Sequence, residues 1–205
     1  MELVTAILMV LIIIFSVVVH EVAHGYAALW VGDTTAHYAG RLTLNPLKHL
    51  DFIGSFLVPL LLSFSGVMFG WAKPVPYNPY NLRNRRWGEL AVAIAGPVSN
   101  ILLAIIFGIF IRVISGGTTE ITSLSFVAAL IVQVNIVLAI FNLIPVPPLD
   151  GSKILFAIMP AQYGKIKVTL ERFGFLIILF FVFFLWQLFT PIIDLLFKLI
   201  SGTSI

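Results

Sequence analysis

Two histidines and a glutamate stand at a spacing that can bind a metal ion, in the run His20-Glu21-Val22-Ala23-His24. Residues four apart share one face of an α-helix, so the two imidazoles can reach the same ion. The intervening carboxylate lies beside the first imidazole, where it can act as a general base, and this H-E-x-x-H pattern is typical of zinc sites. The alternative is a pair of histidines bonded to nearby carbonyl groups. Ionisable groups in an apolar helix are costly and usually functional, which favours metal binding.

A catalytic zinc ion takes three protein ligands, so a third ligand must come from elsewhere in the chain. Asp150 is favoured because it follows an apolar segment whose end is unwound by prolines. Its alternative role is to cap a short helix predicted over 151–159. The spare histidines, His37 and His49, are interpreted as ordinary loop residues. The other aspartates of the chain are Asp33, Asp51 and Asp194.

Composition places the chain among membrane proteins. Its mean hydropathy is +1.09 and only 10% of its 205 residues are charged, too few to cover a soluble surface. The chain has no cysteine, which excludes disulfides, cysteine nucleophiles and thiolate metal sites. A net charge of +3 gives no indication of a nucleic-acid partner.

The apolar pattern predicts an all-α membrane protein, a polytopic bundle of four spanning helices. The first apolar segment has no basic residue before it and is interpreted as a retained helix, not a signal peptide. The short segment 52–66 contains Gly54 and Pro59 and is too short to cross, which predicts a re-entrant segment. Residues 40–44 alternate and predict a short strand, part of a β-hairpin near the active site. The expected spans cover residues 3–30, 89–114, 121–143 and 173–189, with a kinked extension beyond Pro191.

The basic residues predict an orientation in the cell membrane. Loops between apolar segments that are rich in lysine and arginine stay on the cytoplasmic side. The link 115–120 has no such residue. The N-terminus and this link are therefore expected outside, with the active site toward the cytoplasm. The residues that carry this prediction are Arg41, Lys48, Lys73, Arg83, Arg85, Arg86, Lys153, Lys165, Lys167 and Arg172.

Several motifs in one order resemble the site-2 protease family of intramembrane metalloproteases. They are H-E-V-A-H (20–24), A-G-P-V-S-N (95–100) and F-N-L-I-P-V-P-P-L-D-G (141–151). The stretches G-R-L-T-L-N-P-L-K-H-L-D (40–51) and G-W-A-K-P-V-P-Y-N-P (70–79) are similar to small bacterial members. The resemblance covers nearly the whole chain, although no PDZ or CBS domain is expected, and it predicts a single intramembrane protease domain over 1–205.

The resemblance implies one catalytic zinc ion bound by His20, His24 and Asp150. It implies Glu21 as the catalytic glutamate, and Asn142 near the metal, where it could contact the substrate or an oxyanion. The expected partners are a transmembrane protein or peptide substrate and the lipid bilayer. Asn100 is interpreted as a structural residue that bonds backbone freed by Pro97.

Two other functions use the same residues. A metal-ion transporter would need the histidines and the aspartate as a transit site but would not need the acid–base chemistry of Glu21. A non-catalytic membrane scaffold would need neither, and the intact H-E-x-x-H motif argues against it. The sequence does not predict the natural substrate or the oligomeric state.

Overall fold

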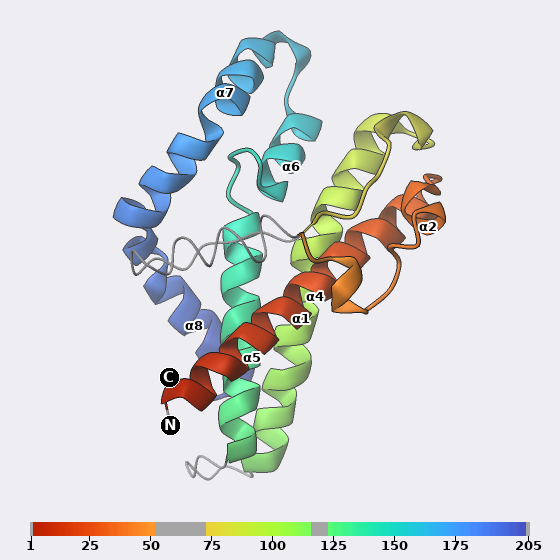
Figure 1. Cartoon of the computed structure of the whole chain (residues 1–205). Coiled ribbons are helices and arrows are strands. Elements are labelled where there is room, and N and C mark those ends of the chain that lie inside the picture. Colours follow the sequence, from red (N-terminus) through yellow and green to blue (C-terminus); the bar gives the residue numbers. More distant parts are fainter. Residues whose placement is uncertain (1, 52–72, 116–122, 204–205) are drawn as a thin grey trace.

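The centre of the molecule is a set of long apolar helices, seen in a computed structural model that describes residues 2–51, 73–115 and 123–203. Helices α1 (Glu2–Trp30), α4 (Arg85–Ser115) and α5 (Ser123–Asn142) pack together, with α1 crossing obliquely over the other two (Figure 1). This arrangement brings the middle of α1, which carries the two histidines, against α4.

Four helices in the described ranges are long and apolar enough to cross a membrane, which confirms the predicted all-α class. No strand occurs in those ranges. The first three spans agree with the prediction to within a few residues, because each apolar run is bounded by polar or proline-rich sequence. The four candidate spans are Leu3–Trp30, Arg85–Ile114, Ser123–Asn142 and Gly164–Leu188.

The main apolar core lies between α4, α5 and the C-terminal helix α8 (Thr190–Ser201). Small side chains such as Ala104 and Ala128 allow the helices to approach closely. Arg112 near the end of α4 donates from Nε to the carbonyl of Ile200 at 2.8 Å, which satisfies the exposed C-terminus of α8. The buried members of this core are Ala104, Ile111, Ala128, Val132, Ile136, Ile193 and Phe197.

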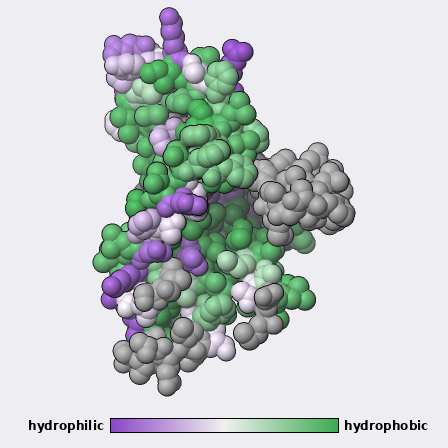
Figure 2. Space-filling model, turned by 90° about the vertical axis from the view of Figure 1, so that its left-hand side faces the viewer, coloured by the Kyte–Doolittle hydropathy of each residue, from purple (hydrophilic) through white to green (hydrophobic). Residues whose placement is uncertain are grey.

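The fourth span stands apart from the others. It begins as α7 (Gly164–Phe180) and continues through a π-turn (Phe181–Leu185) and a 3₁₀-turn (Trp186–Leu188). Gly174 is its one buried residue among those described. The large apolar side chains around it face outward, and Figure 2 shows a broad hydrophobic surface with hydrophilic residues at its upper end. The exposed apolar residues include Phe173, Phe175, Leu176, Phe180, Phe183 and Phe184.

The boundaries of this last span differ from the prediction. The helix begins at Gly164, not at 173, because a polar amphipathic turn containing the Lys167–Glu171 pair precedes the apolar run. Pro191 does not kink a continuing helix. It lies in the first turn of the separate helix α8, where a missing N–H costs nothing.

The predicted strand at 40–44, and with it the β-hairpin, is wrong. The backbone turns at Gly40, whose φ is 63°, and the N–H of Arg41 bonds to the carbonyl of Ala36. The carbonyl of Thr43 accepts from the side chain of His49, so these backbone groups are not available to a ladder. Two short elements lie on either side of residues 40–44: α2 (Thr35–Tyr38) before them and η1 (Pro46–Lys48) after them. The re-entrant segment predicted over 52–66 lies outside the described residues.

A buried carboxylate fixes the connection between α1 and α4. Asp33, just after α1, accepts from the backbone N–H of Asn78 at 2.6 Å and from the side chain of Asn81 at 2.8 Å. It also accepts from the N–H and hydroxyl of Thr35. Burial raises the pKa of the Asp33 carboxyl, but these hydrogen bonds outweigh burial and hold that pKa below its ordinary value. The 3₁₀-turn η3 (Pro79–Asn81) is thereby tied to the end of α1.

We expect Asp33→Asn to lower stability in a pH-dependent way. Because the pKa is lowered in the folded state, the stabilisation is present above the ordinary pKa of about 3.9 and is lost as pH falls through the folded value. The variant should lose about 1–3 kcal/mol at pH 7, because an amide NH₂ group would face N–H donors. The loss should shrink below about pH 4. Thermal unfolding in detergent measures it, with Asp194→Asn as the control because the Asp194 side chain is exposed on α8. Equal melting temperatures for Asp33→Asn and wild type at pH 7 would contradict this role.

Candidate active site

Three side chains converge where α1, α4 and α6 meet. His20 and His24 lie one turn apart on α1, and Asp150 is the first residue of α6 (Asp150–Ile158). The Nε2 atoms of the two imidazoles are 3.0 Å apart, and each lies 3.1 Å from Oδ2 of Asp150. All three residues are buried, with exposed fractions of 5–8%. The structure therefore brings together one ligand atom from each residue of the set predicted to bind zinc.

The outer nitrogens of both imidazoles determine what the inner nitrogens can do. Nδ1 of His24 lies 2.6 Å from the carbonyl oxygen of Val92, and Nδ1 of His20 lies 2.6 Å from Oδ1 of Asn100. A carbonyl oxygen only accepts, so each Nδ1 carries a hydrogen, and in the neutral imidazole each Nε2 then presents a lone pair. Metal-binding histidines are usually held in this way by a partner on the other nitrogen.

These lone pairs fit a metal ion. Two bare imidazole nitrogens and a carboxylate oxygen repel one another at about 3 Å unless a cation lies between them. A tetrahedral zinc ion at about 2.0–2.1 Å from its ligands separates them by about 3.3 Å, close to the observed distances. The donor set, two histidines and an acidic residue, is one that catalytic zinc takes in proteins.

A glycine of α4 lets the two helices meet at this point. A Cβ atom on Gly96 would lie 2.5 Å from Nε2 of His20 and 2.5 Å from Nε2 of His24. Any other residue would therefore occupy the space that the two imidazoles use. Gly96 therefore determines how closely α4 can approach the two imidazoles.

A second glycine positions the carboxylate. Pro145, Pro147 and Pro148 end α5, and the chain turns back so that α6 begins against the end of α5. A Cβ atom on Gly151 would lie 2.3 Å from the carbonyl oxygen of Leu143, so only glycine fits there. Asp150 makes no capping hydrogen bond to its own helix, contrary to its alternative predicted role.

The second carboxylate oxygen of Asp150 has its own partner. Oδ1 lies 3.1 Å from Nζ of Lys153, one turn along α6, while Oδ2 faces the imidazoles. Lys153 also lies over the ring of Tyr77, in the segment before α4. This ion pair keeps one oxygen of Asp150 directed at the histidines and the other directed away from them.

Glu21 lies half-buried beside the cluster and is held by the backbone of a different segment. Its Oε2 accepts a hydrogen bond from the N–H of Val75 at 2.8 Å. Pro74 and Pro76 flank Val75 and have no N–H to offer. The carboxylate thus keeps Oε1 available for another partner, while Oε2 is fixed in place.

Asn142 is bonded within its own helix and is not one of the three converging side chains. Its Nδ2 donates to the carbonyl of Leu138 in the same helix at 2.9 Å, which uses one of the two N–H groups of the amide.

Asn100 bonds to His20 and to Asn135, not to backbone freed by Pro97 as its sequence context suggested. His37 is exposed, and Nε2 of His49 bonds to the carbonyl of Thr43, so neither joins the cluster.

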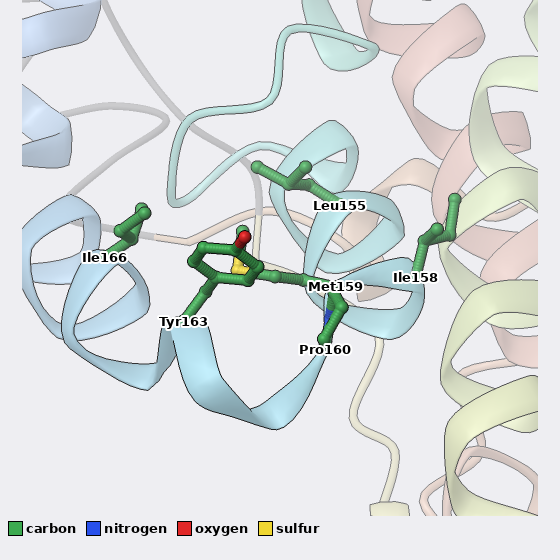
Figure 3. A pocket seen from close by; sticks show the side chains of 6 residues that line it. All are labelled: Leu155, Ile158, Met159, Pro160, Tyr163 and Ile166. Atoms are coloured by element: carbon green, nitrogen blue, oxygen red, sulfur yellow. The ribbon is translucent and has the colours of Figure 1, made fainter.

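An apolar pocket of about 390 Å³ lies at the junction of α6 and α7, separate from these residues. Figure 3 shows side chains from both helices and from the 3₁₀-turn η4 (Ala161–Tyr163) around it. It contains no titratable group apart from Tyr163 and none of the predicted ligands, so it offers no acid–base or metal chemistry. Its lining residues are Leu155, Ile158, Met159, Pro160, Tyr163 and Ile166.

Comparison with known proteins identifies the family. Residues 110–185 match the model of "Peptidase family M50". "Putative zinc metalloprotease YwhC" of Bacillus subtilis is 38% identical over 206 aligned residues, which cover 95% of this chain and 91% of that protein. The chain belongs to peptidase family M50. This confirms the resemblance to the site-2 proteases, and the protein is a zinc metalloprotease with membrane-spanning helices.

More distant relatives agree with this identification. "Putative zinc metalloprotease Rip2" of Mycolicibacterium smegmatis is 26% identical over 80% of this chain and 62% of its own length. "Zinc metalloprotease MJ0392" of Methanocaldococcus jannaschii is 36% identical over 40% of this chain and 23% of its own length. No solved structure is similar enough to this chain to count as a match.

We expect Gly96→Ala to remove metal binding from this M50 peptidase while leaving the helices formed. The added methyl group would displace both imidazoles, and alanine is a better helix former than glycine. Zinc content of the purified protein, measured by atomic absorption beside its circular dichroism, should show less than one tenth of the wild-type metal.

The matched control is Gly164→Ala, because a Cβ atom there would meet nothing within 4 Å. It should keep full zinc content. Wild-type zinc content in Gly96→Ala would show that the site does not lie against α4 as described.

Proposed function

We propose that this protein is an intramembrane endopeptidase that hydrolyses peptide bonds in or near transmembrane segments of other proteins, with residues 1–205 acting as one protease domain. The observation that carries the proposal is the buried convergence of His20, His24 and Asp150, with Glu21 beside it. Three of these residues, His20, Glu21 and His24, lie on a membrane-spanning helix, so the peptide bond must reach them within or at the edge of the bilayer.

The proposed ligands of the catalytic zinc are His20, His24 and Asp150. Zinc in such a site lowers the pKa of water toward about 7 and polarises a peptide carbonyl. Glu21 accepts a proton from the attacking water through its carboxylate and passes it to the leaving amine. Its Oε2 is held by Val75, which supports Oε1 as the oxygen that takes the proton.

Asn142 is proposed to stabilise the oxyanion of the tetrahedral intermediate. One N–H of its amide bonds to Leu138, which fixes the orientation of the amide, and the second N–H is the one to donate. It lies at the end of α5, eight residues before Asp150, on the segment that positions the carboxylate.

We expect Glu21→Gln to abolish cleavage while zinc stays bound. The glutamine side chain keeps the shape of glutamate and can still accept from Val75, but it cannot take up a proton. Cleavage of a model transmembrane substrate by purified protein should fall by a factor of about 100 or more. Zinc content should stay at the wild-type level.

Glu89→Gln is the matched control, because in the described part of the chain Glu89 pairs with exposed Arg85, and this variant should retain activity. A metal-ion transporter would behave differently, since Glu21→Gln would still move zinc across vesicles. Full proteolysis by Glu21→Gln would exclude the proposed base.

The active site is proposed to lie toward the cytoplasmic side. The basic residues that begin α4 and α7 lie toward the upper end of the molecule in Figure 1, as does α6, whereas the last turn of α4 and the start of α5 lie at the lower end. Arg112, in the last turn of α4, is bonded to the end of α8. This excess of basic residues supports a cytoplasmic position for the upper end of the molecule, together with the segments 31–51 and 73–84.

The absence of cysteine from the chain makes this orientation directly measurable. In intact cells, a cysteine in place of exposed Lys165 should be protected from a membrane-impermeant maleimide. A cysteine in place of Ser123, at the opposite end, should be labelled. Lysed cells provide the control, because both positions should then react. The reverse pattern would place the active site on the outer side.

A further inference from the structure

Four polar side chains are buried in one line between α1, α4 and α5, although only one of them belongs to the proposed metal site. They are Ser16, Asn135, Asn100 and His20, with exposed fractions of 2%, 0%, 0% and 6%. Polar side chains at this depth in a membrane protein are costly unless they bond to one another or serve the site. The line therefore needs a physical explanation beyond the two histidines.

The orientation of every group in the line follows from one backbone carbonyl. Nδ2 of Asn135 donates to the carbonyl of Ile131 at 2.9 Å and to Oγ of Ser16 at 2.9 Å. Because a backbone carbonyl only accepts, this end of the Asn135 amide must be the NH₂ group. Its oxygen then faces α4, where it accepts from Nδ2 of Asn100 at 2.8 Å.

The same logic fixes Asn100 and then His20. Since Nδ2 of Asn100 faces Asn135, its oxygen is the atom that lies 2.6 Å from Nδ1 of His20. Only the tautomer with hydrogen on Nδ1 satisfies this contact, and it leaves Nε2 bare. If Asn100 turned over, it would present its NH₂ group to Nδ1, and the hydrogen would move to Nε2.

The two histidines thus reach the same state by different means. His24 bonds directly to the carbonyl of Val92, which cannot turn over. His20 bonds to a side-chain amide, which can turn over. A partner on the other side of the amide is needed to prevent that. Asn135 is the residue that supplies this constraint.

We propose that Asn135 is a positioning residue for the metal centre: through Asn100 it holds His20 in the tautomer whose Nε2 can bind zinc. The proposal rests on His20 being a zinc ligand, as proposed above. A residue that only joined helices would stabilise the bundle without affecting metal affinity, so the two roles can be separated.

The first measurement needs no variant of Asn135. The chain has four histidines, so nitrogen-15 spectra of selectively labelled metal-free protein are simple, and His20→Gln assigns the His20 resonances. We expect His20 to be protonated on Nδ1 and bare on Nε2. Hydrogen on Nε2 with none on Nδ1 in the metal-free protein would overturn the proposal, whatever the variants do.

The second measurement is zinc affinity by competition with a chelator. Asn135→Leu removes the constraint on Asn100 at similar volume, and we expect zinc to bind about 10–100-fold more weakly, the usual effect of losing an outer partner of a ligand. Ser201→Ala is the control, because Ser201 is also buried and bonds to a carbonyl four residues earlier in its own helix, but lies off the line. It should keep wild-type zinc affinity.

A double variant tests the mechanism. Asp at position 100 can only accept, so Asn100→Asp combined with Asn135→Leu should restore the Nδ1 tautomer and zinc affinity together. Weakened affinity that the double variant does not recover, or wild-type affinity in Asn135→Leu with a lower melting temperature, would show that Asn135 only joins helices. Wild-type zinc affinity in His20→Gln would instead refute the assignment of His20 as a ligand, an outcome separate from the tautomer result.

Discussion

The rest of the structure depends on holding three electron-rich atoms together in an apolar interior. Two imidazole nitrogens and a carboxylate oxygen lie within about 3 Å of one another, each turned inward by a hydrogen bond or ion pair on its far side. Their mutual repulsion is strong where water is scarce, so this arrangement persists only if the surrounding helices cannot relax. The cation that relieves the repulsion is also the one that the chemistry requires.

Two glycines supply the rigidity, one for each side of the site. Gly96 allows α4 to contact the imidazoles directly, and Gly151 allows α6 to begin against the last carbonyls of α5. At each glycine the two helices lie closer together than any larger residue would permit. Each glycine therefore fixes the distance between two helices. In a membrane, where apolar packing against lipid is nearly as favourable as packing against protein, such close contacts determine where helices meet.

The sequence predicted the chemistry better than the connections. The spacing of His20 and His24 is a local pattern, and the apolar runs are long enough to span a membrane. Both the metal-binding pair and the spanning helices could therefore be predicted from the sequence. The strand at 40–44 failed because its backbone groups bond to the chain around them and to His49, a contact that alternation of side chains does not reveal. The predicted start of the last span was also wrong. Polar residues extend this helix beyond its apolar part, and the apolar pattern does not reveal them.

The roles of Asn100 and Asn135 could not be predicted because they depend on which helices are neighbours. Nothing in the sequence places residue 135 beside residue 100, and a lone asparagine in an apolar run indicates only that some partner exists. Their burial and their line of bonds to His20 become meaningful once α1, α4 and α5 are packed together.

The proposed metal ligands and the proposed general base are oriented by different parts of the molecule. The three proposed ligands are positioned by contacts among helices, whereas Glu21 is positioned by the N–H of Val75, in a segment outside the described spans. Prolines on both sides of Val75 prevent that segment from becoming helical and leave a single N–H there to donate. A movement of the segment would therefore reorient Glu21, the proposed base, without disturbing the proposed ligands.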